Sequence, residues 1–161
     1  MEEESSHGFF VYANDVSFRS MTRADLDEVM AIERRSFAYP WSARFFLQEI
    51  AVQCAQPIIA EINGRIAGYI LFWVLPDDVD IHNIAVHPDF RRQGIGRQLL
   101  DQAIASARTR ASLRVTLEVR KSNLSAQKLY ESHGFVVTGL RKGYYSDDGE
   151  DAITMALELK V

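Results

Sequence analysis

The stretch VHPDFRRQGIGRQLL, residues 86–100, marks the point at which a predicted strand passes into the longest predicted helix of the chain. Two arginines precede Gly94 and Gly96, and apolar residues of helical spacing follow. The first turn of a helix leaves about four backbone N–H groups without internal partners, and the helix dipole adds partial positive charge there. The junction therefore predicts a site for a phosphate-bearing ligand, with a merely solvated turn as the alternative.

The spacing of the glycines excludes two common nucleotide-binding motifs. A P-loop requires G-x-x-x-x-G-K-[ST], and this stretch has neither that spacing nor the lysine. A dinucleotide-binding fingerprint requires G-x-G-x-x-G, and Leu99 stands where the third glycine would be. The sequence around Gly94 and Gly96 thus favours a bound phosphate group over a solvated turn, outside the P-loop and dinucleotide-binding classes.

The periodicity of apolar residues predicts an α/β domain with a mixed, mostly antiparallel sheet and four helices. Asn63-Gly64 predicts a tight hairpin, and Ser42 predicts the start of a helix whose apolar face is Phe45, Phe46 and Ile50. The predicted helices cover 22–34, the segment after Ser42, 94–110 and 122–133, and the predicted strands cover 16–20, the two halves of 57–76, 78–88, 113–119, 135–145 and 151–159.

Composition sets the class of the protein. The 161 residues are 47% hydrophobic and 25% charged, with a formal net charge of −4, which is ordinary for one globular domain and gives no overall basic field for nucleic acid. The single cysteine, Cys54, excludes an internal disulfide, and no segment reaches the length of a membrane span. We expect a flexible leader at 1–14 and one soluble cytoplasmic domain at 15–161, with no membrane or nucleic-acid partner and an open oligomeric state in which a monomer is preferred.

Four sequence blocks together resemble a known family. R-R-x-G-x-G follows NIAVHP, and the other three blocks are YPWS, LEVRKSNLSAQKLYESHGF and RKGYYSDDGEDAITMAL. In this order they resemble the GNAT superfamily of acetyltransferases and, within it, the ribosomal-protein-alanine N-acetyltransferases. The resemblance implies a single-domain GNAT fold over 15–161 whose sheet is splayed at the cofactor site. Two departures from the subfamily are the acidic leader and Asp80-Ile81-His82 before NIAV.

The resemblance implies acetyl-CoA as the co-substrate and no metal. The strand backbone would pair with the pantetheine arm, as a sheet edge pairs with an added strand, and the start of the long helix would hold the pyrophosphate. The implied cofactor contacts are Ile84, Ala85, Val86, Arg91, Arg92, Gln93, Gly94, Ile95, Gly96, Arg97 and Asn123. On its residue type alone, Asn123 is equally well explained as a helix N-cap.

The resemblance also implies two catalytic residues. Glu118 would accept the proton of the acceptor amine, and Tyr130 would donate a proton to the departing thiolate. From the residues alone, Glu118 is also readable as a surface charge alternating with aliphatic neighbours, and Tyr130 as a packed aromatic. His82 lies near the predicted site and could assist proton transfer or simply pack, and its spacing from His87 does not indicate a metal site.

The acceptor implied by the subfamily is a protein N-terminus, an alanine of a small-subunit ribosomal protein. An α-amino group has a pKa of about 8 and a lysine about 10.4, so a single carboxylate base suits the former better. Candidates to line the peptide groove are Tyr39, Trp41, Tyr144 and Tyr145, of which the last two are expected as strand neighbours facing opposite sides. The alternatives are a GNAT enzyme for lysine side chains or small amines and a non-catalytic acyl-CoA-binding regulatory module.

Overall fold

The alternating apolar residues build one seven-stranded sheet with helices on both faces, in a computed structural model that describes residues 15–159. The expected leader at 1–14 lies outside the described residues. The α-helices are α1 (Leu26–Ser36), α2 (Ala43–Ala51), α3 (Ile95–Thr109) and α4 (Leu124–Ser132). The strands are β1 (Val16–Ser20), β2 (Ala55–Ile62), β3 (Arg65–Val74), β4 (Asp78–Val86), β5 (Arg114–Arg120), β6 (Val136–Arg141) and β7 (Ala152–Glu158).

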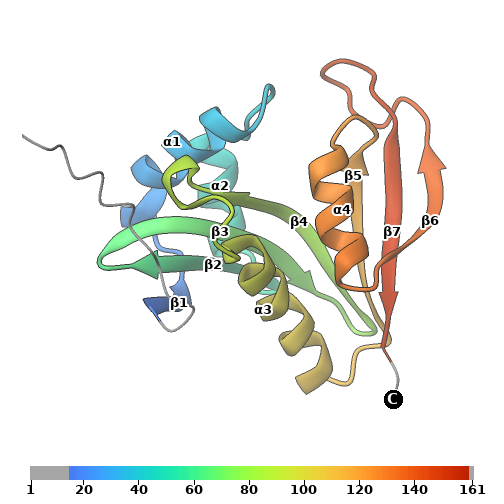
Figure 1. Ribbon diagram of the computed structural model, residues 1–161, viewed down its shortest axis with the longest axis horizontal. Helices are drawn as coiled ribbons and strands as arrows, with labels where there is room; N and C mark the ends of the chain where they lie inside the picture. Colours follow the sequence, from blue (N-terminus) through green and yellow to red (C-terminus); the bar gives the residue numbers. More distant parts are fainter. Residues whose placement is uncertain (1–14, 160–161) are drawn as a thin grey trace, which may run out of the picture.

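The strand order in the sheet is β1-β2-β3-β4-β5-β7-β6 (Figure 1). All neighbouring pairs are antiparallel except β4 and β5, which are parallel because α3 carries the chain back between them. The predicted class, a mixed and mostly antiparallel sheet flanked by four helices, is confirmed.

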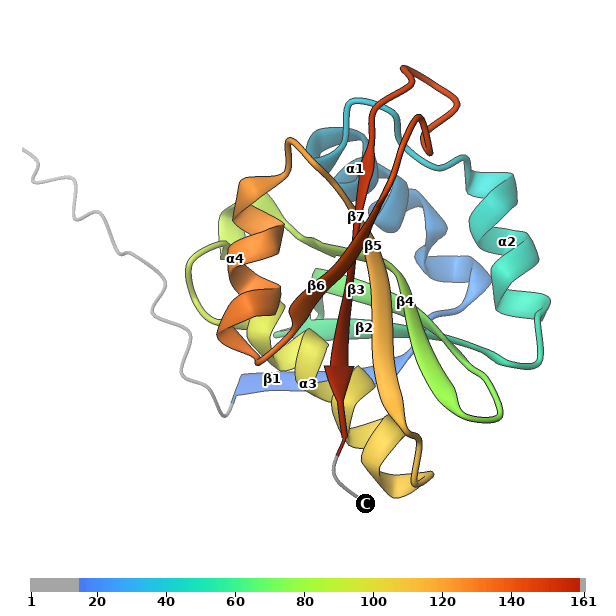
Figure 2. The same ribbon diagram turned by 90° about the vertical axis from the view of Figure 1, so that its right-hand side faces the viewer.

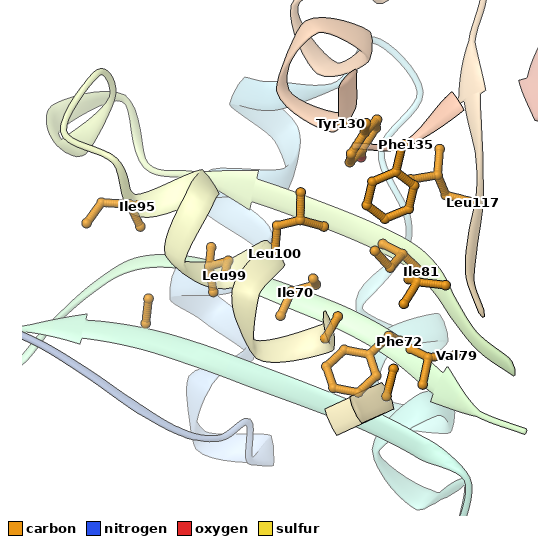
Figure 3. Packing of buried hydrophobic residues seen from close by; sticks show 14 of the residues in the cluster. Ile70, Phe72, Val79, Ile81, Ile95, Leu99, Leu100, Leu117, Tyr130 and Phe135 are labelled. Atoms are coloured by element: carbon orange, nitrogen blue, oxygen red, sulfur yellow. The ribbon is translucent and has the colours of Figure 1, made fainter. Parts of the chain in front are cut away.

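Two hydrophobic cores lie on the two faces of the sheet. In β3, Ile70 and Phe72 belong to the core that includes the apolar face of α3, whereas Tyr69 and Leu71 belong to the core under α1 and α2. Figure 2 shows α4 and α2 on opposite sides of β5 and β7. Figure 3 shows Ile70 close to Leu99 and Leu100 of α3 and Phe72 close to Val79 of β4 in the first of these cores. Because β3 is buried on both faces, it reads as a continuous apolar run.

Local sequence signals explain several element ends. Asn63 and Gly64 have φ values of 49° and 76°, the left-handed conformations that the two-residue hairpin between β2 and β3 requires. The Ser42 side chain accepts a hydrogen bond from Phe45 N and caps α2, as predicted. Gly134, with φ of 91°, follows the end of α4.

A β-bulge interrupts β4. Phe72 of β3 pairs with Ile81, and the preceding residue, Leu71, pairs with Asn83. His82 is therefore an extra residue with no counterpart on β3. A bulge of this kind bends its strand and redirects the side chains that follow it.

The bulge moves the side chains after it to the other face. Ile81 packs in the core under α3, and strict alternation would send Asn83 to that same face. Instead, Asn83 donates a hydrogen bond to Glu33 of α1 on the opposite face, and Ile84 packs against the α3 core.

The parallel pairing of β4 and β5 ends in the middle of the sheet. It covers 78–81 and 114–117 and stops at Ile81 and Leu117, although β4 continues to Val86. Beyond that point the two strands diverge, as Figure 1 shows. Backbone donors and acceptors on the inner edges of both strands are thereby left available to a ligand.

Three sequence-based expectations need correction. Phe45 is 39% exposed, because α2 turns only its Phe46 side toward the core. Strand β6 ends at Arg141, so Tyr144 and Tyr145 lie in the connection 142–151 and are not strand neighbours. A short 3₁₀ turn also separates Thr22 from the first residue of α1.

Within the described residues 15–159, the helices are too short or too polar to cross a membrane.

Gly68 tests the close approach of β3 and β4. A Cβ at this residue would lie 2.6 Å from the carbonyl oxygen of Ala85, which is backbone and cannot simply turn away. We expect Gly68→Ala to lower the free energy of unfolding by about 1–3 kcal/mol, measured by urea denaturation. Gly139→Ala is the matched control, because its Cβ would meet only the Thr154 hydroxyl, at 3.2 Å. Equal losses in the two variants would contradict the close approach as the cause.

Candidate active site

The first cavity lies at the point where β4 meets the start of α3. It has a volume of about 470 Å³ and is bordered by the last residues of β4, the loop before α3 and the start of α4. All the residues predicted to contact acetyl-CoA line it except Gln93. Its other lining residues, which sequence reasoning did not name, are Ser36, Phe37, Phe90, Ser125, Ala126 and Leu129.

The loop before α3 adopts a conformation that presents backbone to this cavity. Gly94 has φ of 80° and precedes the first helical residue, and Arg92 has φ of 59°. A left-handed conformation costs a non-glycine residue free energy, so the surrounding structure must hold Arg92 in place. Residues 94–97 line the cavity with the first turn of the helix, where N–H groups lack internal partners.

Gly96 leaves space in the first cavity that a side chain at this residue would occupy. A Cβ at this residue would lie 3.5 Å from Leu129 Cδ2 and 3.7 Å from Val86 Cγ2, both ordinary contact distances. Packing of the protein alone therefore does not require glycine here. All three residues line the cavity, so a side chain at residue 96 would narrow the space between α3 and α4.

The three arginines of this loop differ in their contacts. Arg91 donates hydrogen bonds to the Val86 carbonyl at 3.2 Å and to Ser36 Oγ at 3.4 Å, so it ties the loop to β4 and α1. Arg92 and Arg97 have no ion-pair partner among residues 15–159. Their positive charge is thus available to a negatively charged ligand in the cavity.

Asn123 caps α4 and also lines the cavity. Its Oδ1 accepts a hydrogen bond from Ala126 N at 3.1 Å and caps α4. Its amide nitrogen has no hydrogen-bond partner among the described residues, and Asn123 lines both this cavity and the next.

A second cavity of about 220 Å³ adjoins the first. The two share Phe37, Ile84, Asn123 and Ala126 as lining residues. Of the predicted catalytic and substrate-contacting residues, Glu118, Tyr130, Tyr39, Trp41 and Tyr145 line the second cavity. A group held at the inner end of the first cavity would therefore be within reach of one entering the second.

Glu118 follows Leu117, the last residue of β5 that pairs with β4. Its side chain is 27% exposed, and its Oε1 accepts a hydrogen bond from Arg141 at 3.3 Å. It faces away from the aliphatic residues of β5, which belong to the core under α3. The carboxylate is thus open to the cavity and able to accept a proton there.

Tyr130 lies opposite in α4 and is 5% exposed. No described residue makes a hydrogen bond with its hydroxyl, and its ring packs against Phe135 at a centroid distance of 5.8 Å. Burial, with a smaller effect of Tyr145, raises the pKa of Tyr130 above its usual value. The phenol therefore keeps its proton at neutral pH and is able to donate it.

Glu33 of α1 is the main site residue that sequence reasoning missed. It is 1% exposed and accepts three hydrogen bonds: from Trp41 N at 2.9 Å, from Asn83 Nδ2 at 3.0 Å and from the Tyr69 hydroxyl. Burial and the charge of Glu33 raise the pKa of Tyr69 far above its usual value, so Tyr69 remains a donor. The available signal was a glutamate next to Ile32 on the apolar face of α1.

Arg120, at the end of β5, was also missed and holds the β6–β7 connection over the second cavity. Its guanidinium forms ion pairs with Asp147 at 2.6 Å, Asp148 at 3.0 Å and Glu150 at 3.3 Å. It also lies 3.9 Å from the ring centroid of Tyr145. The signal was an arginine at a strand end together with the acidic run SDDGED.

The two tyrosines of the connection are placed differently. Tyr145 lines the second cavity, and burial raises its pKa to about 12. Tyr144 does not line it, is 42% exposed and lies over Arg141 at 4.4 Å. Because both residues lie in a loop, this difference does not come from strand alternation.

Within residues 15–159, no group of three or more His, Cys, Asp or Glu side chains is arranged to hold a metal ion.

Comparison with known proteins gives consistent results. Residues 26–135 match the model of the acetyltransferase (GNAT) family. The chain is 40% identical over 138 residues to a putative [ribosomal protein bS18]-alanine N-acetyltransferase of Bacillus subtilis (strain 168). The aligned region covers 85% of this chain and 91% of that protein.

Two solved structures are similar over most of the chain. The ribosomal-protein-S18-alanine N-acetyltransferase from Escherichia coli has a TM-score of 0.82 at 37% identity, covering 91% of this chain and 95% of that one. Naa20 of Chaetomium thermophilum, in complex with a bisubstrate analogue, has a TM-score of 0.79 at 29% identity, covering 89% of this chain and 86% of that one.

The Glu33 network gives a stability prediction. Glu33→Gln replaces one accepting oxygen by an NH₂ group that faces donors, so buried hydrogen bonds are lost. We expect the free energy of unfolding to fall by about 1.5–3 kcal/mol in urea denaturation. Glu28→Gln, on the exposed side of the same helix, should change it by less than about 0.5 kcal/mol. A neutral Glu33→Gln would show that the network does not hold the site together.

Proposed function

Because the chain belongs to the GNAT family of acetyltransferases, we propose that it transfers an acetyl group from acetyl-CoA to the α-amino group of a protein N-terminus. The acceptor is proposed to be the N-terminal alanine of a ribosomal protein, as the names of its relatives state for those proteins. The single observation that carries this proposal is the junction of two cavities at Ile84 and Asn123, one with a helix N-terminus and one with a carboxylate and a buried phenol.

The residues of the first cavity fit acetyl-CoA. Residues 94–97 offer N–H groups to the pyrophosphate, and Arg92 and Arg97 add positive charge. The inner edge of β4 beyond Ile81 offers unpaired backbone to the amide groups of the pantetheine arm. When bound, acetyl-CoA supplies an activated thioester, and the protein supplies position and proton transfer.

Glu118 and Tyr130 divide the proton transfers. Glu118 accepts a proton from the acceptor nitrogen, directly or through water, as the C–N bond forms. Tyr130, which is protonated at neutral pH, donates its proton to the departing sulfur. The two groups come from β5 and α4 and line the same cavity, so both reach the reacting atoms without rearrangement of the fold.

The second cavity suits the first residue of a peptide. Its volume of about 220 Å³ accepts a small side chain with the adjoining amide. Tyr39 and Trp41 line it from the loop before α2, and Tyr145 lines it from the β6–β7 connection. An α-ammonium group, with a pKa of about 8, also releases its proton to a carboxylate more readily than lysine does.

The test of the function is the release of CoA thiol with a panel of acceptors. The panel comprises peptides beginning Ala-, Ser- and Met-, a peptide with an internal lysine and a blocked N-terminus, and a polyamine. We expect the highest kcat/KM with the peptide beginning Ala-. Preference for lysine or a polyamine would overturn the proposed acceptor. CoA binding with no thiol release on any amine would favour the non-catalytic module.

Gly96 tests the cofactor cavity. The branched side chain of Gly96→Val would enter the space between Leu129 and Val86, so we expect the Kd for acetyl-CoA to rise at least about 10-fold in calorimetry. Gly96→Ala should have a smaller effect, because its Cβ makes ordinary contacts. Unchanged affinity in a Gly96→Val protein of unchanged Tm would remove this cavity as the binding site.

Glu118→Gln and Tyr130→Phe test the proton transfers. Each variant keeps the shape of its side chain, and each should lower kcat at least about 10²-fold while the Kd for acetyl-CoA is kept. Lys128→Gln, on the exposed part of α4, is the control and should keep the wild-type rate. Wild-type kcat in both site variants would contradict their assignment.

A further inference from the structure

A second titratable group, His82, lines the acceptor cavity across from Glu118. Its Nε2 lies 2.9 Å from Asp80 Oδ2, and the other oxygen, Asp80 Oδ1, accepts a hydrogen bond from Thr116 Oγ1 at 2.7 Å. Its ring also packs against Trp73, with 4.9 Å between centroids. The imidazole is thus fixed by a carboxylate that is itself fixed from the neighbouring strand.

The strand register explains why His82 and Glu118 share one cavity. Ile81 and Leu117 are the last residues at which β4 and β5 pair with each other, and both face the core under α3. His82 and Glu118 are the next residues on the two strands, and both face the opposite side. They therefore stand at the two sides of the point where the strands part.

The hydrogen bond to Asp80 sets the proton arrangement of the His82 ring. A carboxylate accepts only, so Nε2 carries the proton and Nδ1 keeps a free lone pair. No residue from 15 to 159 forms a hydrogen bond with Nδ1.

The acceptor nitrogen gives up two protons in the reaction. An α-amino group with a pKa of about 8 arrives mostly as an ammonium at pH 7, and its nitrogen loses two protons on the way to the amide. Glu118 provides one acceptor, and one of its oxygens already receives a hydrogen bond from Arg141.

We propose that His82 accepts the first proton, from the ammonium form of the acceptor, before Glu118 accepts the second as the C–N bond forms. The C–S bond breaks, and the sulfur takes the proton of Tyr130. The proton on Glu118 then passes to Tyr130 and restores the phenol. The proton on His82 passes to solvent, so one proton is released for each amide formed. Asp80 is a positioning residue that stabilises the imidazolium. This inference rests on the proposed function.

Other charged and titratable groups face the same cavity. They come from α1, the loop before α2, β5, α4 and the β6–β7 connection, and they are Glu33, Tyr39, Glu118, Arg120, Tyr130, Tyr145 and Asp147. Glu33 is held by three donors and Arg120 by three carboxylates, so neither is free to exchange protons with the acceptor. His82, in contrast, has a ring nitrogen without a hydrogen-bond partner among residues 15–159, and this nitrogen is able to accept a proton.

The test compares pH profiles of kcat/KM for wild type and His82→Phe with a peptide beginning Ala-. Phe keeps a ring against Trp73 but accepts no proton. We expect a loss of about 10-fold at pH 7 that nearly disappears at pH 9, because the free fraction of an amine with a pKa of about 8 rises about 10-fold between these pH values. Asp80→Asn should show the same pH-dependent loss, and His133→Gln, at the far end of α4, should match wild type.

A second readout does not depend on turnover. Long-range ¹H–¹⁵N correlation spectra should show His82 protonated on Nε2 in the wild type and a changed tautomer in Asp80→Asn. In an enzyme that turns over, a pH profile of kcat/KM for His82→Phe that runs parallel to that of wild type would overturn the inference. A neutral His82 ring that carries its proton on Nδ1 would overturn it too. Failure of the proposed function is distinct, because it appears as a wild type without turnover on any amine at any pH.

Discussion

The end of the β4–β5 pairing at Ile81 and Leu117 is the constraint on which the site depends. Two parallel strands that remained paired would satisfy each other's backbone groups and close the space between them. The bulge at His82 coincides with this point and turns the rest of β4, so that Asn83 reaches α1 and Ile84 reaches the first cavity. One extra residue in β4 thus turns Asn83 toward the second cavity and leaves Ile84 at the point where the two cavities meet.

Buried polar contacts keep this open arrangement rigid. Glu33 joins α1, β3, β4 and the loop before α2 through hydrogen bonds, and each of its partners would be unsatisfied without it. Arg120 does the same at the mouth of the acceptor cavity, where it gathers the acidic residues of the β6–β7 connection. An enzyme that positions groups by hydrogen bonds avoids reorganisation during the reaction.

Much of the fold was predictable because local signals agree with the tertiary structure. The hairpin at Asn63-Gly64, the cap at Ser42 and the apolar face of α3 each follow from short-range backbone and packing rules. The errors fall where tertiary contacts decide. Tyr144 and Tyr145 read as a strand but lie in a loop, which ion pairs to Arg120 hold instead of a ladder.

The sequence by itself determined the order of elements, the glycine-marked helix start at Gly94 and the family of acetyltransferases. These depend on residues close together in the chain, where backbone preference and motif spacing act directly. Only the tertiary structure decided that Glu33 supports the site, that β4 bulges at His82 and that His82 and Glu118 line one cavity. The physical reason is that strand register and buried hydrogen bonds join residues up to 50 positions apart, a relation that no local pattern records.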